Sequence, residues 1–331
     1  MAQNFVAGSS AVLLYGYETT FGTEVTGTNP FGAGVDLSIS RKNNLEKVYG
    51  VGSRNATTTV AKQYEGSLSL NFALANGNFF FGILGTTPTD SPSGDLYTHT
   101  YVEDNTTFNV PSFSVDNSIE MGTNDMVSTY VSCKINSATI SANVNDIVKV
   151  SLDTIYKTET LATSTKFTNV AETEGVFTFA NGTIEIPDGT TIAAVQSFEM
   201  TMTNNLEYLW GVGSRLATAG VEKQRDYAFK ISAAFNNITT LLTYFLDGTD
   251  SATAPDASTP TKQATLILTF TNGAASPNTE SIVMTFADIW FDDESLPQNV
   301  NDIVKEDVTG HALSCTSVVW TNNTATAMAV T

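Results

Sequence analysis

The stretches "NNLEKVYGVGSRNAT" at residues 43–57 and "NNLEYLWGVGSRLAT" at residues 204–218 are near copies within one chain. Their alignment continues without gaps to 21 positions at a constant offset of 161, with 14 identities. A second repeated stretch, "NVNDIVK", stands at residues 143–149 and unaltered at residues 299–305. Because the two repeats occur in the same order in both halves, the sequence predicts a duplicated domain.

The chain is long enough for two such modules, since 331 residues can supply two ordinary hydrophobic cores. We place the modules at residues 1–165 and 166–331. The segment "ETLATSTKFTNVAETEG", residues 159–175, is polar and lacks clear periodicity, so it is predicted to be the linker.

Alternating apolar residues flank each copy of the motif. Residues 35–40 ("VDLSIS") and 196–203 ("QSFEMTMT") precede the two copies, and residues 64–76 and 225–235 follow them. Period-two alternation predicts strands with one buried face. Each motif therefore lies in the connection between two strands, and "GVGSR" is predicted to be a turn in a long hairpin loop.

A denser apolar segment follows each of these strands, at residues 78–86 and 237–249. In the second, Asn237 can cap a helix and Gly248 can end it, so a short helix packed on a sheet is expected in each half. The predicted class is mainly β, with two tandem β-sandwich or barrel modules, each flanked by a short α-helix. Further strand-like runs are residues 107–115, 134–142, 147–157, 263–270, 280–291 and 311–320.

The net charge is −19, from 15 basic and 34 acidic residues. The electrostatic field of this negative charge repels polyanions, so a protein that binds nucleic acid tightly is disfavoured. A protein surface along which DNA slides without binding is still allowed. We expect neither a secretory signal nor a membrane span. Cys133 and Cys315 are expected to be buried free thiols, with a disulfide between them as the alternative.

The sequence predicts no enzyme and no cofactor. His99 and His311 lack triad or metal spacing and are expected to be structural or solvated. In "GVGSR" the third glycine of a dinucleotide-binding motif is replaced by Asn55 and by Leu216. The acidic run "WFDDES", residues 290–295, has no equivalent in the first half and is expected to be a solvated turn rather than a metal site.

With catalytic chemistry absent from the pattern, the repeated motif is predicted to form an interface. Each copy carries large apolar groups, an arginine and a glutamate, and we expect each arginine to pair with the glutamate of its motif. The alternative is that these side chains pack on their own module's core. The predicted interface residues are Leu45, Glu46, Tyr49, Val51, Arg54, Leu206, Glu207, Trp210, Val212 and Arg215.

The arrangement of paired strands, a long "NNLE...GVGSR" loop, a strand leading into a short helix and a closing "NDIV" segment resembles the tail tube proteins of long-tailed bacterial and archaeal viruses. The resemblance implies that six modules form a ring and that rings stack into a hollow tube. A two-module chain would then form trimeric rings with pseudo-sixfold symmetry.

The resemblance also implies roles for particular residues. Residues 43–63 and 204–224 would reach the neighbouring subunit or ring, and the flanking strands would line the lumen. The expected partners are other copies of the chain and tail proteins such as the tape measure and tail terminator, with viral DNA passing without tight binding. The implied location is the virion tail, assembled in the host cytoplasm, with no membrane partner. Candidates for the lumen wall are Asp36, Glu65, Glu199 and Asp226.

Two other readings of the pattern stay open. One is a different structural protein built from duplicated β-sandwiches, in a capsid, baseplate or cell surface. The other is a glycan-binding or glycan-cleaving β-protein, for which Trp210, Trp290 and Trp320 would supply aromatic surfaces and Asp292 and Glu294 a carboxylate pair.

Overall fold

The structure is a computed structural model. It describes residues 8–121, 124–187, 189–192, 194–235, 241–247, 254–255, 264–275, 278–300 and 303–325. Within these residues the chain is mainly β, with 58% strand and 6% helix, which confirms the predicted mainly β class, while the two tandem modules stay a prediction.

The elements of the first half begin with a 3-10 turn and end with an edge strand. They are η1 (Gly8–Ser10), β1 (Ala11–Tyr17), β2 (Ala33–Lys42), β3 (Leu45–Tyr49), β4 (Ala56–Ala61), β5 (Glu65–Ala73), η2 (Asn78–Phe80), α1 (Phe81–Leu84), β6 (Thr89–Ser93), β7 (Leu96–Tyr101), β8 (Phe113–Ile119), β9 (Asp125–Asn143), β10 (Lys149–Tyr156) and β11 (Thr158–Ser164).

The second half holds one helix among its strands. Its elements are η3 (Phe179–Asn181), β12 (Gly182–Glu185), β13 (Val195–Thr203), β14 (Glu207–Trp210), β15 (Ala217–Val221), β16 (Asp226–Ala234), α2 (Leu241–Asp247), β17 (Ala264–Thr271), β18 (Ser281–Ser295) and β19 (Lys305–Asn322).

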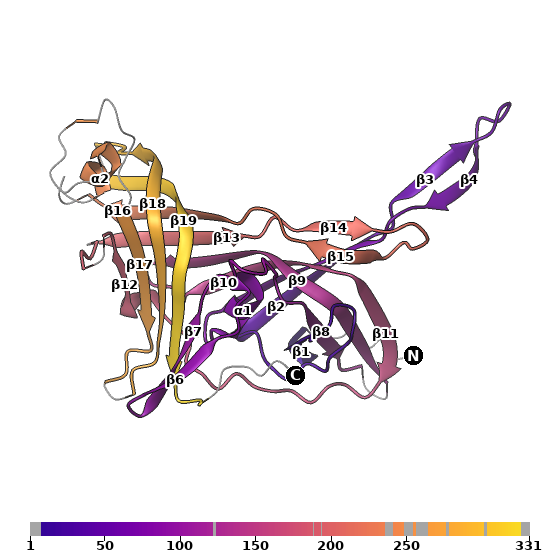
Figure 1. The fold of residues 1–331 in the computed structure, drawn as a ribbon, viewed down its shortest axis with the longest axis horizontal. Coiled ribbons are helices and arrows are strands. Elements are labelled where there is room, and N and C mark those ends of the chain that lie inside the picture. Colours follow the sequence, from indigo (N-terminus) through magenta and orange to yellow (C-terminus); the bar gives the residue numbers. More distant parts are fainter. Residues whose placement is uncertain are drawn as a thin grey trace.

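One 15-stranded antiparallel sheet runs through both halves, with the main order β12-β17-β18-β19-β16-β13-β9-β10-β5-β2. The long strand β9 joins its parts, because its first segment pairs with β8 and β11 and its second with β10 and β13. The hairpins β3–β4 and β14–β15 stand outside this sheet. Figure 1 shows β17, β18 and β19 at one end of the molecule and the β3–β4 hairpin projecting at the other.

Strand pairings in the two halves repeat with constant offsets. The β2–β5 and β13–β16 pairs match at 161 residues, and the β9–β10 and β18–β19 pairs match at 156 residues, including a β-bulge at the same place. Equivalent partners are Lys42–Glu65 and Thr203–Asp226 for the first offset, and Leu152–Ala138 and Val308–Glu294 for the second. The module boundary at residues 165 and 166 stays a prediction, since the sheet is continuous through the β13–β9 pair.

The predicted alternation places one face of these strands in the core. In β5 the buried side chains are Leu68, Leu70 and Phe72, and the equivalent positions of β16 are Phe229, Ile231 and Ala233. Both expected helices form, and α1 packs against β9 as α2 packs against β18. Gly85 ends α1 with a φ of +97° and an N–H that donates to Phe81 O. The expected cap Asn237 and stop Gly248 lie outside the described residues.

Three expectations about local structure are wrong. The predicted linker contains β11, which pairs with β9 through its backbone although most of its side chains are exposed. The acidic run at residues 290–295 belongs to β18 rather than to a turn. In the run at residues 107–115, β8 begins only at Phe113. The two cysteines, Cys133 and Cys315, are buried and free as predicted, and burial raises the pKa of both thiols. Within the described ranges, no helix has the length and apolar character needed to cross a bilayer.

Candidate inter-subunit site

Both copies of the repeated motif fold into β-hairpins with the same turn. The pairs Tyr49–Ala56 and Trp210–Ala217 close the two hairpins, and a bulge precedes each pair. In both turns "GVGSR" supplies a glycine with positive φ, +83° at Gly52 and +99° in the second copy. This conformation is readily adopted only by glycine. The expectation that "GVGSR" is a turn is confirmed, and the flanking residues extend it into a two-stranded arm.

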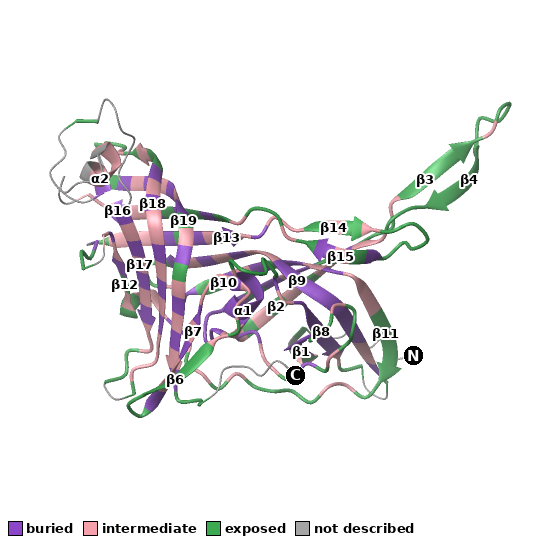
Figure 2. Cartoon of the chain, in the orientation of Figure 1, coloured by how far each residue is buried: buried purple, intermediate pink, exposed green. Residues whose placement is uncertain are grey.

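The first hairpin is exposed along both strands (Figure 2). Leu45 and Tyr49 each expose 62% of their surface, and the turn residue Val51 is fully exposed. Glu46 forms an ion pair with Lys62 at the base of the hairpin. An arm with several exposed large apolar side chains is typical of a surface that binds another protein.

The second hairpin, in contrast, is docked on the base of the first. Arg215 Nε donates to Lys62 O at 2.7 Å, and Arg215 Nη2 donates to Asn43 Oδ1 at 2.9 Å and to Asn43 O at 3.3 Å. The backbone N–H of Tyr64 donates to Arg215 O at 2.9 Å. The turn of one module therefore binds the hairpin base of the other within a single chain.

Two contacts with the sheet hold the second hairpin in place. The Tyr208 hydroxyl donates to Gly66 O and accepts from the Tyr156 N–H at 3.2 Å. Lys134 Nζ donates to Gly220 O at 3.1 Å and pairs with Glu222. These bonds explain why β14 and β15 are partly buried where β3 and β4 are not.

The predicted pairing of each arginine with the glutamate of its motif is wrong. Glu46 pairs with Lys62 and Glu207 with Lys223, because each lysine is the diagonal cross-strand neighbour of its glutamate, two residues beyond the one directly opposite. Arg215 instead reaches the other hairpin. Val212 is fully exposed and Leu206 and Trp210 are partly buried, while Arg54 is exposed in the first turn. The acceptors at Asn43 and Lys62 and the donor N–H of Tyr64 were not predicted, although Asn43 and Lys62 are kept in both copies of the motif.

The base of the second hairpin carries two open pockets, each of about 510 Å³. Both are lined by Lys223 and Gln224, and one extends to the exposed aromatic side chain of Phe108. Lys223 is equivalent to Lys62, which binds the Arg215 turn. The hairpin base that has no docked turn is therefore the one that is hollowed.

The four acidic residues predicted to face a lumen lie on one face of the sheet. Glu65 pairs in register with Lys42, which shares the face of Asp36, and Asp226 pairs with Thr203, which shares the face of Glu199. The core-facing residues alternate with them, so this is the polar face of the sheet. Around them are mainly serine and threonine side chains.

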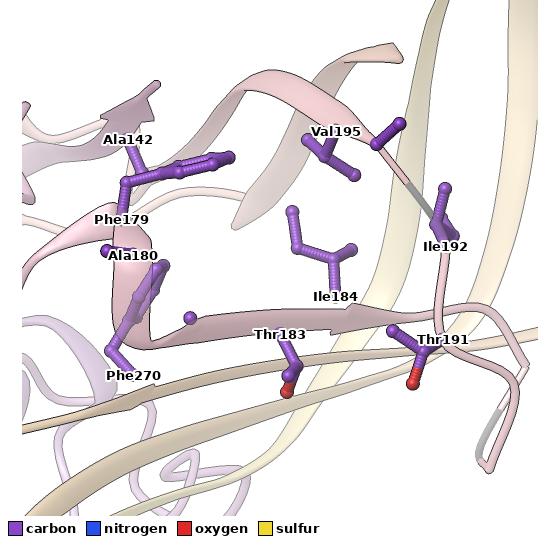
Figure 3. A pocket seen from close by; sticks show the side chains of 11 residues that line it. Ala142, Phe179, Ala180, Thr183, Ile184, Thr191, Ile192, Val195 and Phe270 are labelled. Carbon is purple, nitrogen blue, oxygen red and sulfur yellow. The ribbon is translucent and has the colours of Figure 1, made fainter. Parts of the chain in front are cut away.

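An apolar pocket of about 250 Å³ lies between η3, β12 and the segment before β13 (Figure 3). Phe179, Ile184, Ile192 and Phe270 turn toward it, and none of its described lining residues is ionisable. It can hold an apolar group but presents no acid, base or metal ligand. Across the described ranges no cluster of three histidine, cysteine, aspartate or glutamate side chains is placed to bind a metal.

Of the candidate residues for a sugar site, Trp290, Asp292 and Glu294 share strand β18, but Trp320 is not available at the surface. Trp320 is buried in the core, with its ring 5.0 Å from that of His99. His99 is itself buried and hydrogen-bonded to Asp90 and Asn322, which makes it a structural histidine. His311 binds Asp292 at the surface.

Comparison with known families adds the deciding observation. The model of the family described as phage tail tube protein matches residues 8–316, nearly the whole chain. The chain belongs to the phage tail tube protein family. No curated protein matches the sequence. Membership in this tail tube family implies a structural component of the virion tail rather than an enzyme.

Proposed function

We propose that the chain assembles with itself into trimeric rings of pseudo-sixfold symmetry, and that these rings stack into a hollow tube through which viral DNA passes. The observation that carries the proposal is the docking of the Arg215 turn on the base of the first hairpin. One chain supplies two hairpins and two bases but uses only one of each. A head-to-tail contact that repeats the internal one would close a ring.

In this assembly the turn of the first hairpin, with Arg54 at its tip, docks on the second hairpin base of a neighbouring copy. The pockets beside Lys223 are in the equivalent position to receive it. The interaction would bury Leu45, Tyr49 and Val51, whose exposure in the free chain is otherwise unfavourable.

The polar face of the sheet would line the lumen. Asp36, Glu65, Glu199 and Asp226 give this face acidic groups, and the net charge of −19 repels the DNA phosphates. DNA moves easily along a wall that it does not bind, so an acidic lumen suits passage. Tail proteins that measure and terminate the tube are the proposed further partners.

Negative-stain electron microscopy of the purified chain, over a range of concentrations and salt, tests the proposal. We expect stacked rings with a central channel wide enough for a DNA duplex. Persistent monomers under all conditions would refute it. Arg54→Ala should impair assembly while leaving the free chain folded. Lys166→Ala is the matched control, because Lys166 pairs with Glu120, which belongs to neither hairpin.

A further inference from the structure

Two strand pairings join the halves of the sheet, β19 with β7 and β13 with β9, and we call the second of them the internal joint. Residues Ser197–Thr203 of β13 pair antiparallel with Ser137–Asn143 of β9. On the core face Met202 lies opposite Ala138, and both are fully buried. Val150 on β10 pairs with Ile140, two residues along β9, so it is a buried diagonal neighbour of Ala138.

Within the described residues, the equivalents of these two strand segments are both edges. Strand β2, the equivalent of β13, is the last strand of the sheet and pairs only with β5 among the described strands. Strand β18 is the equivalent of this part of β9, and its described pairing with β17 reaches Ile289, opposite Ala264, where the described part of β17 begins. Residues 293–299 therefore have no strand on that side within the described part of the chain.

The contact of helix α2 with β18 is compatible with a partner strand at this edge. It contacts β18 as α1 contacts β9, and α1 leaves the β9 edge free for β13. A strand edge presents unpaired backbone N–H and C=O groups that can pair with another chain. In the segment 293–299, β18 ends at Ser295 and Pro297 lacks an N–H, so a partner strand would extend β18 by the remaining residues and find no donor at Pro297.

The equivalent joint between two copies is found by subtracting 161 from the residue numbers on β13 and adding 156 to those on β9 and β10. This gives a defined register between β2 of one copy and the end of β18 of another. Met202 and Ala138 become Arg41 and Glu294, and the residue equivalent to Val150 is Glu306. The apolar contact of the internal joint is thus replaced by an arginine placed against two glutamates.

The two glutamates are unsatisfied in the free chain. Glu306 is only 4% exposed, and both Glu294 and Glu306 have a buried carboxylate oxygen without a hydrogen-bond partner among the described residues. Burial, followed by the charge of Glu294, raises the pKa of Glu306 to about 7. A buried carboxylate beside a partly buried one is unfavourable without a cation, and an arginine guanidinium is the group that fits the pair best.

Arg41 is positioned to serve both sides of the joint. In the free chain its Nε donates to Glu159 at 2.7 and 2.8 Å, and its Nη2 donates to the Tyr130 hydroxyl at 3.2 Å. The side chain remains 47% exposed. The guanidinium has five donors, so these bonds leave it able to donate to the carboxylates of a second copy.

The polar face of the same register is also complementary. In the internal joint the hydroxyls of Thr139 and Thr201 lie 3.0 Å apart. Their equivalents are Ser295 and Ser40, both exposed and both hydroxyl-bearing. The pairing of small hydroxyl residues is therefore kept between copies.

Two further pairs agree with this register. Lys42 comes opposite Asp293, which gives a second ion pair of opposite charge. Ile39 comes opposite Leu296 on the core face, and both side chains are only partly buried in the free chain. Opposite-charge and apolar cross-strand pairs each stabilise antiparallel strands.

We propose that β2 of one copy pairs with residues 293–299 of a second copy in the register Arg41–Glu294, with Arg41 binding both Glu294 and Glu306. This inference rests on the proposed self-assembly and names the surface through which it occurs. It makes the sheet continuous from copy to copy and assigns a role to the acidic run at the end of β18.

Cysteine cross-linking tests the register directly. The double variant Ser40→Cys with Ser295→Cys should form disulfides between copies on mild oxidation, giving covalent dimers and trimers on non-reducing gels. Residues directly opposite in a sheet have Cβ atoms ~5 Å apart, and diagonal ones ~7–8 Å apart. In the control variant, Ser38→Cys with Ser295→Cys, the cysteine on β2 lies two residues away from the position opposite Ser295. The two cysteines are then diagonal neighbours and should cross-link poorly. Equal cross-linking of the two double variants would overturn the register. So would the absence of cross-links in the Ser40→Cys, Ser295→Cys variant when it assembles into particles like those of the wild type.

Charge exchange tests the arginine. Arg41→Glu should raise the concentration needed for assembly about tenfold or more, because the new carboxylate would lie with those of Glu159, Glu294 and Glu306, four acids in all. The double variant Arg41→Glu with Glu294→Arg should restore assembly, and Lys166→Glu, with the same change in net charge away from both edges, should have little effect. If the double variant does not assemble although other variants form tubes, the proposed β2–β18 pairing is refuted but the proposed tube is not. Failure of the wild-type chain to assemble refutes both.

Discussion

Glu306, at the start of β19 beside Glu294 of β18, leads to a prediction with opposite signs for folding and for assembly. Replacing Glu306 by Gln removes an unpartnered carboxyl group whose pKa is raised from 4.5 to about 7 by burial and by Glu294. Opposite it on β16 stands Ala233, so among the described residues the facing charge comes from β18. The raised pKa means that the folded chain binds this proton more tightly than the unfolded chain.

The sign and magnitude follow from that difference. The stability contributed by the protonated group is fully present below about pH 4.5 and is lost as the pH rises through about 7. A change from 4.5 to about 7, at ~1.4 kcal/mol for each pKa unit, corresponds to at most ~3 kcal/mol. Glu306→Gln should therefore raise the free energy of unfolding of the free chain by ~1–3 kcal/mol at pH 8 and by little at pH 4.5.

Urea unfolding of dilute, unassembled protein at the two pH values measures this effect. Glu174→Gln is the matched control, because the pKa of Glu174 is also raised to about 7, mainly by burial, while its carboxylate accepts from Asn322, away from both open edges. Both variants should stabilise the free chain at pH 8, and only Glu306→Gln should weaken assembly, since Arg41 would lose one of its carboxylates. Equal stabilisation by Glu306→Gln at both pH values would refute the electrostatic reasoning. Stronger assembly of that variant would count against the joint.

Three further predictions concern the hairpins and the sheet beneath them. Trp210→Ala should lower the free energy of unfolding by ~1–2 kcal/mol because the ring is partly buried. Tyr49→Ala should change it by less than ~0.5 kcal/mol but reduce assembly, because this side chain is exposed. Thermal melts measure the effect on stability, and microscopy measures the effect on assembly. Arg215→Ala should loosen the docked turn, seen as faster proteolysis at both hairpin turns, and unchanged cleavage would show that the arginine does not hold it. Gly66→Ala should destabilise the chain by ~3 kcal/mol, because its Cβ would lie 2.1 Å from the ring of Tyr156, and a melting curve like that of the wild type would contradict this packing.

Much of the architecture follows from two simple patterns in the sequence. The repeated motif marked both hairpins, and period-two alternation marked the strands on each side and put Asp36 and Glu199 away from the core. The expectations that failed lie at sheet edges. Strand β11 pairs through its backbone with exposed side chains, so it lacks the apolar alternation that identifies a strand.

The sequence shows that residues of the proposed joint are charged at core-facing positions, but it does not indicate what they bind. Alternation in "SISRK" puts Arg41 on the core face of its strand, where Met202 stands in the other half. A charge at such a position is unusual, and so is Glu306 on the core face of β19. Their meaning depends on the pairing of β9 with β13, which joins segments far apart in sequence and is not indicated by any local pattern.

The difference between the two joints has a physical reason. The internal joint, with Met202 on Ala138, forms as the chain folds and never has to face water, so it can be apolar. The joint between copies must exist as two exposed edges before assembly. Apolar edges would pair without control, and inward-pointing charges on an edge strand are a known protection against that. Arg41 on one edge and Glu294 and Glu306 on the other keep each edge from pairing with its own kind, while the two edges remain complementary. The same duplicated joint is thus used once as a permanent contact and once as a contact that forms only with a second copy in the correct orientation.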